Sequence, residues 1–79
     1  RPRIISPPVG STYLLDPELP TRGQRLKLIS NLNDEFRWEC PTLTLDGDTA
    51  LLTPGTHTLT LHHTASGKYT TRKFTVDSL

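Results

Sequence analysis

The sequence contains one cysteine and no methionine, and each scarcity restricts what the chain can be. A single cysteine excludes an internal disulfide and a structural zinc site built from several cysteines. No apolar run approaches the roughly 20 residues of a membrane-spanning helix, so we expect no membrane span in this chain. The lack of methionine, even at position 1, predicts that these 79 residues are a fragment of a longer protein.

Net charge is also small. Nine Lys and Arg residues stand against eight Asp and Glu residues, which gives a net charge of +1. So balanced a chain has no strong attraction to nucleic acid or to an anionic membrane surface, and we expect neither as a partner. Five cations could still form a basic strip, with a solvated strand face as the simpler interpretation; they are Arg25, Lys27, Lys68, Arg72 and Lys73.

Only 6% of the residues are aromatic, and the single tryptophan lies in the most informative stretch, Phe-Arg-Trp-Glu-Cys at residues 36–40. Its period of two places Phe36, Trp38 and Cys40 on one face of a strand, with the charged residues on the other. We therefore expect a central strand with Trp38 buried in the core, rather than exposed as a stacking platform for a sugar or base. Cys40 is expected to be a small buried apolar residue.

The same alternation recurs along the chain, and no segment has a helical period. The cleanest examples are residues 24–30 and 56–63, and Asp46-Gly47-Asp48 signals a tight hairpin turn between two others. Short strands with turn signals about every 8 to 12 residues are typical of an immunoglobulin-like β-sandwich. We predict an all-β fold, a single immunoglobulin-like β-sandwich domain of about seven short antiparallel strands over residues 1–79.

Candidate catalytic and metal-binding side chains are present, but their spacing favours neither chemistry. His57 and His63 would face the same way, yet six residues of strand span about 20 Å, too far for both to bind one ion. His62 would lie on the opposite face, and we expect no carboxylate partner for any of the three. No Gly-x-Ser-x-Gly elbow or Ser-x-x-Lys motif occurs. We predict no metal, no cofactor and no catalytic residue, with His57 hydrogen-bonded to the turn at Pro54-Gly55.

The beginning of the chain carries a distinctive motif, Ile-x-Ser-Pro-x-x-Gly-x-x-Tyr-x-Leu-Asp-Pro-x-Leu-Pro, at residues 4–20. With it, the sequence resembles the start of the C-terminal domain of class A penicillin-binding proteins of the 1C type. The resemblance continues at residues spread over most of the remaining chain: Gln24, Arg25, Leu26, Trp38, Asp46, Gly47, Pro54, Gly55, His57, Leu59, Gly67, Phe74 and Val76. The opening motif is the specific part of the match.

The resemblance implies a parent that is a bifunctional peptidoglycan synthase, with an inner-membrane anchor followed by glycosyltransferase and transpeptidase domains. This chain would be the C-terminal module of that parent, in the periplasm. The family's catalytic Ser-x-x-Lys and Lys-Thr-Gly motifs belong to the transpeptidase domain and are absent here, so no catalytic residue carries over. The resemblance predicts a non-catalytic accessory domain that contacts the neighbouring transpeptidase domain or another protein. A carbohydrate-binding module for peptidoglycan glycan is the alternative.

The proline-rich segment at residues 6–20 is the candidate contact surface, with Tyr13, Asp16 and Glu18 as its contact residues. Loops fixed by several prolines lose little conformational entropy on docking. The alternative is that these prolines only hold the segment against the sheet edge and prevent edge-to-edge aggregation. Exposed aromatic rings would favour glycan binding, and we expect most of the aromatic residues to be internal.

Overall fold

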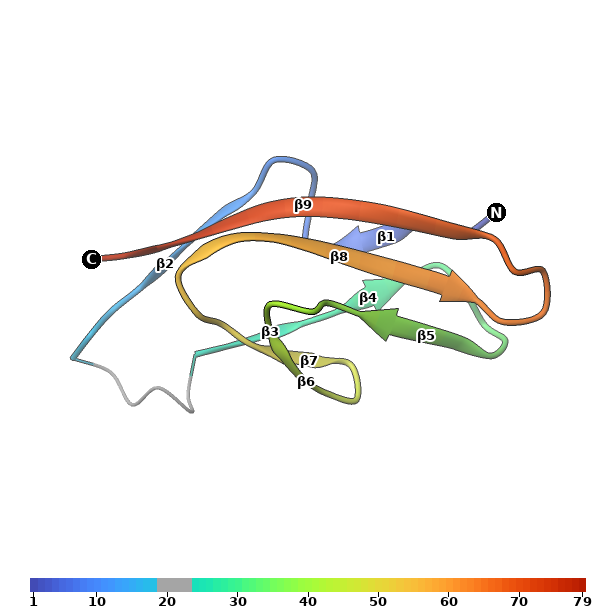
Figure 1. Cartoon of the computed structure of the whole chain (residues 1–79), viewed down its shortest axis with the longest axis horizontal. Coiled ribbons are helices and arrows are strands. Elements are labelled where there is room, and N and C mark those ends of the chain that lie inside the picture. The colour runs from blue at the N-terminus through green and yellow to red at the C-terminus, as the bar shows by residue number, and fades with distance from the viewer. Residues whose placement is uncertain (19–23) are drawn as a thin grey trace.

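The computed structural model describes residues 1–18 and 24–79, and these residues form strands and turns without a helix (Figure 1). The strands are β1 (Ile4–Ser6), β2 (Thr12–Leu15), β3 (Arg25–Lys27), β4 (Ile29–Ser30), β5 (Phe36–Glu39), β6 (Thr44–Asp46), β7 (Thr49–Leu51), β8 (Gly55–His63) and β9 (Tyr69–Ser78). The predicted all-β class is confirmed. Among these residues, no helix has the length and apolar character needed to cross a membrane.

The strands form three sheets. The largest has four strands in the order β2-β9-β8-β5, in which β2 is parallel to β9 and the other neighbours are antiparallel. A second sheet has the antiparallel order β3-β7-β6, and β1 pairs antiparallel with β4 in the third. The prediction of about seven antiparallel strands is therefore wrong in two respects. The described residues form nine strands, and one pair of them is parallel.

One predicted strand, residues 24–30, is divided at Leu28 because its two halves pair with different neighbours. β3 pairs with β7, whereas β4 pairs with β1. Leu28 lies between them and donates its backbone N–H to the carbonyl oxygen of Asp48 at 2.6 Å. The predicted alternation survives the division, since Leu26 and Leu28 are buried and the residues next to them in β3 and β4 are exposed.

The stretch predicted to be the central strand lies at a sheet edge. Among the described strands, β5 pairs only with β8, and β8 and β9 occupy the middle of the four-stranded sheet. The predicted alternation is confirmed, because Phe36 and Trp38 pack against the core, Cys40 is buried, and Arg37 and Glu39 are exposed. Trp38 itself is only partly buried, since an edge strand has a neighbour on one side alone. Its predicted place at the centre of the core is corrected.

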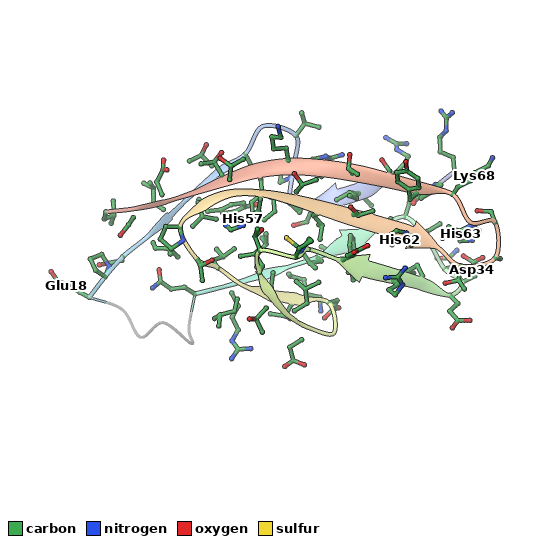
Figure 2. The ribbon with its side chains drawn as sticks, viewed as in Figure 1. Glu18, Asp34, His57, His62, His63 and Lys68 are labelled. Atoms are coloured by element: carbon green, nitrogen blue, oxygen red, sulfur yellow. The ribbon has the colours of Figure 1, made fainter. Side chains whose placement is uncertain are left out.

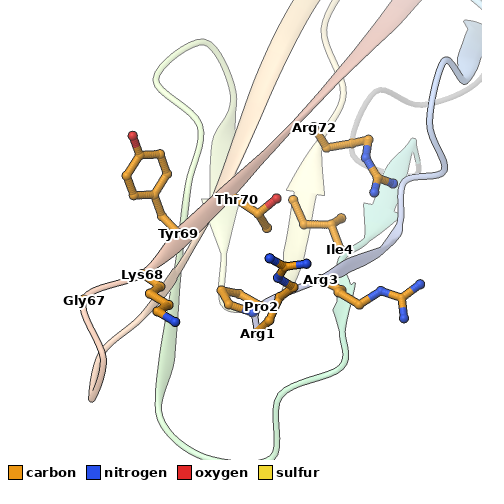
Figure 3. A pocket seen from close by; sticks show the side chains of 9 residues that line it. All are labelled: Arg1, Pro2, Arg3, Ile4, Gly67, Lys68, Tyr69, Thr70 and Arg72. Carbon is orange, nitrogen blue, oxygen red and sulfur yellow. The ribbon is translucent and has the colours of Figure 1, made fainter.

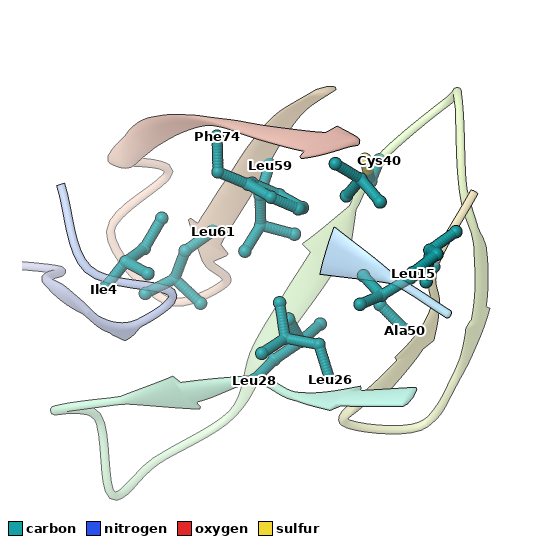
Figure 4. Close-up of a cluster of buried hydrophobic side chains, with 11 residues drawn as sticks. Ile4, Leu15, Leu26, Leu28, Cys40, Ala50, Leu59, Leu61 and Phe74 are labelled. Atoms are coloured by element: carbon teal, nitrogen blue, oxygen red, sulfur yellow. The ribbon is translucent and has the colours of Figure 1, made fainter. Parts of the chain in front are cut away.

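The core lies between the four-stranded sheet and the two smaller sheets (Figure 4). Four of its large side chains that are almost fully buried come from β8 and β9, where Leu59, Leu61, Phe74 and Val76 are each at most 2% exposed. Among the described residues, the buried members of this core are Ile4, Leu15, Leu26, Leu28, Cys40, Ala50, Leu52, Leu59, Leu61, Phe74 and Val76. Cys40 is a free buried thiol, as predicted.

The Asp-Gly signal marks a hairpin, as predicted. Gly47 and Asp48 form a two-residue turn between β6 and β7, where Asp46 is paired with Thr49. Gly47 has a φ of 61°, which suits the first central position of a type II′ turn and favours glycine there. The ammonium of Lys27 lies 3.0 Å from the Asp48 carboxylate, and this hydrogen bond holds the pKa of Asp48 below its ordinary value.

Candidate functional site: a basic groove beside a free strand edge

A groove of about 850 Å³ opens between the N-terminal segment and the start of β9 (Figure 3). Arg1 and Arg3 line it from the segment that leads into β1. Lys68 and Arg72 line it from the other side, where the β8–β9 loop continues into β9. The two sides are distant in sequence and meet because β1 contacts β9.

The groove carries a local excess of positive charge, although the net charge of the whole chain is only +1. Four Lys and Arg residues among those that the structure describes line it, and none of the eight Asp and Glu residues does. Within residues 1–18 and 24–79, the side chains of Arg1, Arg3 and Lys68 have no ion-pair partner. Cations on both sides of a cleft attract an anionic ligand more strongly than the same charges spread over a surface.

The basic strip predicted from sequence is divided between two sheets. Arg25 and Lys27 lie on β3 of the three-stranded sheet, whereas Arg72 and Lys73 lie on β9. Sequence reasoning missed the contribution of Arg1 and Arg3, because these residues reach the groove only through the packing of β1 beside β9. The one available signal was that Arg1 and Arg3 are two positions apart, because alternate residues of an extended segment lie on the same face.

Arg72 connects the two sides of the groove. It shares the inner face of β9 with Phe74 and Val76 but lies nearer the loop, where it is only partly buried. Its Nη1 donates a hydrogen bond of 2.6 Å to the carbonyl oxygen of Pro7, 65 residues away in sequence. A charged side chain that points inward near a sheet edge discourages the uncontrolled addition of further strands.

The backbone edge of β9 is paired along only part of its length. β2 pairs with residues 75–78 of β9 and with no earlier residue. At the boundary, Thr75 donates its N–H to the carbonyl oxygen of Ser11 at 3.2 Å, so the backbone groups of Thr75 point toward β2. No described strand continues this pairing toward the β8–β9 loop.

The direction of the unpaired groups follows from strand geometry. Along a strand, the N–H and C=O groups of successive residues point to opposite sides. Tyr69 and Thr71 are each separated from Thr75 by an even number of positions, so their backbone groups also point away from β8. Each would offer one donor and one acceptor to an added strand beside the groove.

The predicted contact residues are only partly brought together. Tyr13 is partly buried on β2, with its ring 6.0 Å from that of Phe74 in an edge-to-face arrangement. Asp16 and Glu18 lie in one turn, where the Asp16 carboxylate accepts the Glu18 N–H at 2.9 Å. Glu18 is exposed at the end of the molecule opposite the β8–β9 loop (Figure 2). Residues 19 and 20 of the predicted contact segment lie outside the described residues.

The predicted hydrogen bond from His57 to the turn before it is confirmed. His57 is only 3% exposed, and its Nε2–H donates to the carbonyl oxygen of Thr53 at 2.7 Å. Because a carbonyl only accepts, Nδ1 of the neutral ring is free to accept from the hydroxyl of Thr42, also at 2.7 Å. His57 is therefore a satisfied core histidine, with its ring tilted against that of Phe74.

The expectation that no carboxylate pairs with a histidine is wrong. His62 Nε2 lies 2.7 Å from Glu39 Oε1. His63 Nε2 lies 2.7 Å from Asp34 Oδ2, and Figure 2 shows these two residues side by side. Both carboxylates are distant in sequence and come from β5 or the turn before it. The alternation of residues within β8 could not predict these two carboxylate partners. Within the described residues, no group of three metal-binding side chains is found.

Ser66, His63 and Asp34 form a hydrogen-bonded line, because Ser66 Oγ lies 2.7 Å from His63 Nδ1. These are the side-chain types of a nucleophilic site, but the two backbone N–H groups that follow Ser66 in the loop already have partners. The Gly67 N–H donates to the His63 carbonyl oxygen at 2.9 Å, and the Lys68 N–H donates to Ser66 Oγ at 3.1 Å. The line instead clamps the β8–β9 loop to the turn before β5, and its hydrogen bond from His63 holds the pKa of Asp34 below its ordinary value.

Comparisons of the chain with protein-family models, with characterised proteins and with solved structures each give no match. The resemblance to the penicillin-binding proteins therefore stays a prediction that rests on the motifs quoted for it.

Proposed function

We propose that this chain is an immunoglobulin-like β-sandwich that serves as a non-catalytic accessory domain and acts by binding protein. Its parent, on the resemblance of the motif at residues 4–20, is a bifunctional peptidoglycan synthase with its domains in the periplasm. The observation that carries the proposal is the free backbone edge of β9 beside a basic groove. Protein segments are bound at such edges through main-chain hydrogen bonds.

Strand order supports the immunoglobulin-like arrangement. In that fold, one sheet contains the second, fifth and fourth strands, and the other contains the third, sixth and seventh. Counting β3 and β4 together as the second strand, the orders β3-β7-β6 and β5-β8-β9 correspond to these two sheets. The first strand would be divided, with β1 beside β4 in one sheet and β2 beside β9 in the other.

The positions of the aromatic side chains favour protein over glycan as the ligand. Binding of a sugar ring generally needs an exposed aromatic face to stack on. Tyr69 is 66% exposed, whereas Phe74 is buried and Tyr13, Phe36 and Trp38 are partly buried against the core. One exposed ring beside four cations suits a charged peptide better than a glycan strand.

The test is a pair of titrations of the ¹⁵N-labelled chain, followed by chemical-shift changes. One uses the transpeptidase domain of a class A synthase of the 1C type, and the other uses soluble peptidoglycan glycan fragments. We expect saturable shifts with the protein and none with the glycan. An unrelated acidic protein is the control for non-specific attraction to the groove. Saturable shifts with glycan alone would overturn the proposal.

A further inference from the structure

We propose that the basic groove binds an extended acidic segment of a partner protein, which pairs with β9 at Tyr69 and Thr71 as an added strand. The inference rests on the proposed function and specifies the chemistry of the partner. It differs from the predicted contact surface around Asp16 and Glu18, which lies at the other end of the molecule (Figure 2).

β2 occupies only one end of the free side of β9. β2 runs parallel to β9 and ends its pairing at Thr75, so a second segment beside Tyr69 and Thr71 would extend the same side of β9. The N–H and C=O groups of these two residues provide two donors and two acceptors for it. An extended segment of about five residues is long enough to use all four, since a strand rises about 3.3 Å per residue.

The charges that line the groove select the kind of segment. Lys68 and Arg72 line one side of the groove, and Arg1 and Arg3 stand on the opposite side. A strand added at the edge would project every second side chain into the groove, between these two pairs of cations. Carboxylates at those alternate positions match the charge, whereas lysines would be repelled.

The same cations explain how a free edge is kept from pairing with any exposed strand. Lysine and inward-pointing charge at an edge are common protections against edge-to-edge association. A second copy of this chain would present the same four cations to the groove, so like charges would oppose its pairing there. The edge thus stays available to an acidic segment and closed to a basic or apolar one.

The experiment uses the whole chain and synthetic peptides. The probe is a seven-residue peptide that alternates Thr and Glu, with both ends blocked. One control peptide has Lys in place of Glu, and another carries N-methyl groups on alternate amides, so that its carboxylates remain while its backbone donors on one side are removed. Two such peptides are made, with the methylated positions offset by one residue, so that each of the two hydrogen-bonding edges of the peptide is blocked in one of them.

We expect the acidic peptide to bind with an affinity that falls as salt is added. It should shift the amide signals of Tyr69 and Thr71 and slow their hydrogen exchange. One of the two N-methylated peptides should lose about tenfold or more in affinity, as expected from the loss of the two hydrogen bonds that the peptide donates to the carbonyls of Tyr69 and Thr71. The lysine peptide should show no saturable binding.

Variants of the chain test both the backbone pairing at β9 and the contribution of the cations. Thr71→Pro removes a backbone donor that faces away from β8, and proline is tolerated where a strand's N–H faces solvent. It should abolish peptide binding while the shifts of β8 residues stay in place. Arg3→Gln and Lys68→Gln should each weaken binding about two- to fivefold, as expected for exposed charge pairs. Arg37→Gln on β5, outside the groove, is the matched control and should have no effect.

The outcomes separate this inference from the proposed function. Binding of the acidic peptide with no protection of Tyr69 and Thr71, or with equal affinity for both methylated peptides, would refute strand addition. Shifts caused by the transpeptidase domain that cluster outside the groove would leave the proposed function standing and overturn the site. Peptide binding at β9 without binding of that domain would support the site and remove the proposed partner. Binding of soluble glycan in the groove would refute an acidic peptide as the ligand.

Discussion

Replacement of His57 by phenylalanine tests the account of the buried histidine most directly. The phenyl ring is somewhat larger than imidazole, but it is flat and aromatic like it and keeps the contact with Phe74, whose centroid lies 5.6 Å from that of His57. What it removes is the pair of hydrogen bonds to Thr42 and Thr53, both 2.7 Å long. The variant therefore removes the hydrogen bonds while an aromatic ring stays in place at a position that is 3% exposed.

The expected loss of stability in His57→Phe follows from the two hydrogen bonds that it removes. A hydrogen bond contributes a net stability of about 0.5 to 1.5 kcal/mol, so two of them contribute about 1 to 3 kcal/mol. Thr42 and Thr53 are exposed, so water can hydrate the groups left without a partner and the full penalty of a buried unpaired group does not apply. A domain of 79 residues has a total stability of about 4 to 12 kcal/mol, so the loss is substantial but leaves the fold intact.

The assay is equilibrium unfolding in urea, followed by circular dichroism. With a slope of about 1 kcal/mol/M, the midpoint should fall by about 1 to 3 M in His57→Phe. Thr42→Val should lose about half as much, and the double variant should show a coupling energy of about 0.5 to 1.5 kcal/mol. Thr58→Val, on the exposed face of β8, is the control. A His57→Phe variant as stable as the wild type would refute the reasoning.

Two further predictions concern the edge of the four-stranded sheet. The pKa of Asp34 is lowered by its hydrogen bond from His63, so this stabilising contribution is complete above the ordinary carboxyl pKa of 3.8 and is lost as the pH falls through the lower pKa of the folded state. Urea titrations between about pH 5 and pH 2 should show a smaller acid-induced loss of stability in Asp34→Asn than in the wild type. The same dependence of the unfolding free energy on pH in both proteins would contradict the assignment. Trp38→Phe should change stability by no more than about 1 kcal/mol, because the buried Trp38 Nε1–H has no partner among the described residues, whereas Trp38→Ala should lose about 2 to 4 kcal/mol. Equal losses in thermal or urea unfolding of the two Trp38 variants would count against this explanation.

Features set by local periodicity could be predicted from the sequence. The alternation in β8 placed His57, Leu59 and Leu61 on the inner face, and all three are buried. The Asp46-Gly47 dipeptide marked a two-residue turn, because glycine is favoured at a positive φ between paired strands. In each case, residues within a few positions of one another determine the outcome.

Features set by pairing between distant strands could not be predicted in the same way. Nothing in the Phe36 to Cys40 pattern distinguishes an edge strand from a central one, because both expose one face and bury the other. The hydrogen bond between His63 and Asp34 depends on the turn before β5 lying beside the end of β8. The groove likewise depends on β1 lying beside β9, which brings Arg3 opposite Lys68.

The parallel pairing of β2 with β9 also determines how the chain would respond to mechanical force. A pull on the chain before β2 and after β9 acts along both strands in opposite directions, because Thr12 is paired with Thr75 and Leu15 with Ser78. The load then shears the backbone hydrogen bonds of this pair together, instead of opening them one at a time. A parallel pair of four residues near the two ends of the chain would act as a mechanical clamp, and the core behind it would be protected until the clamp yields.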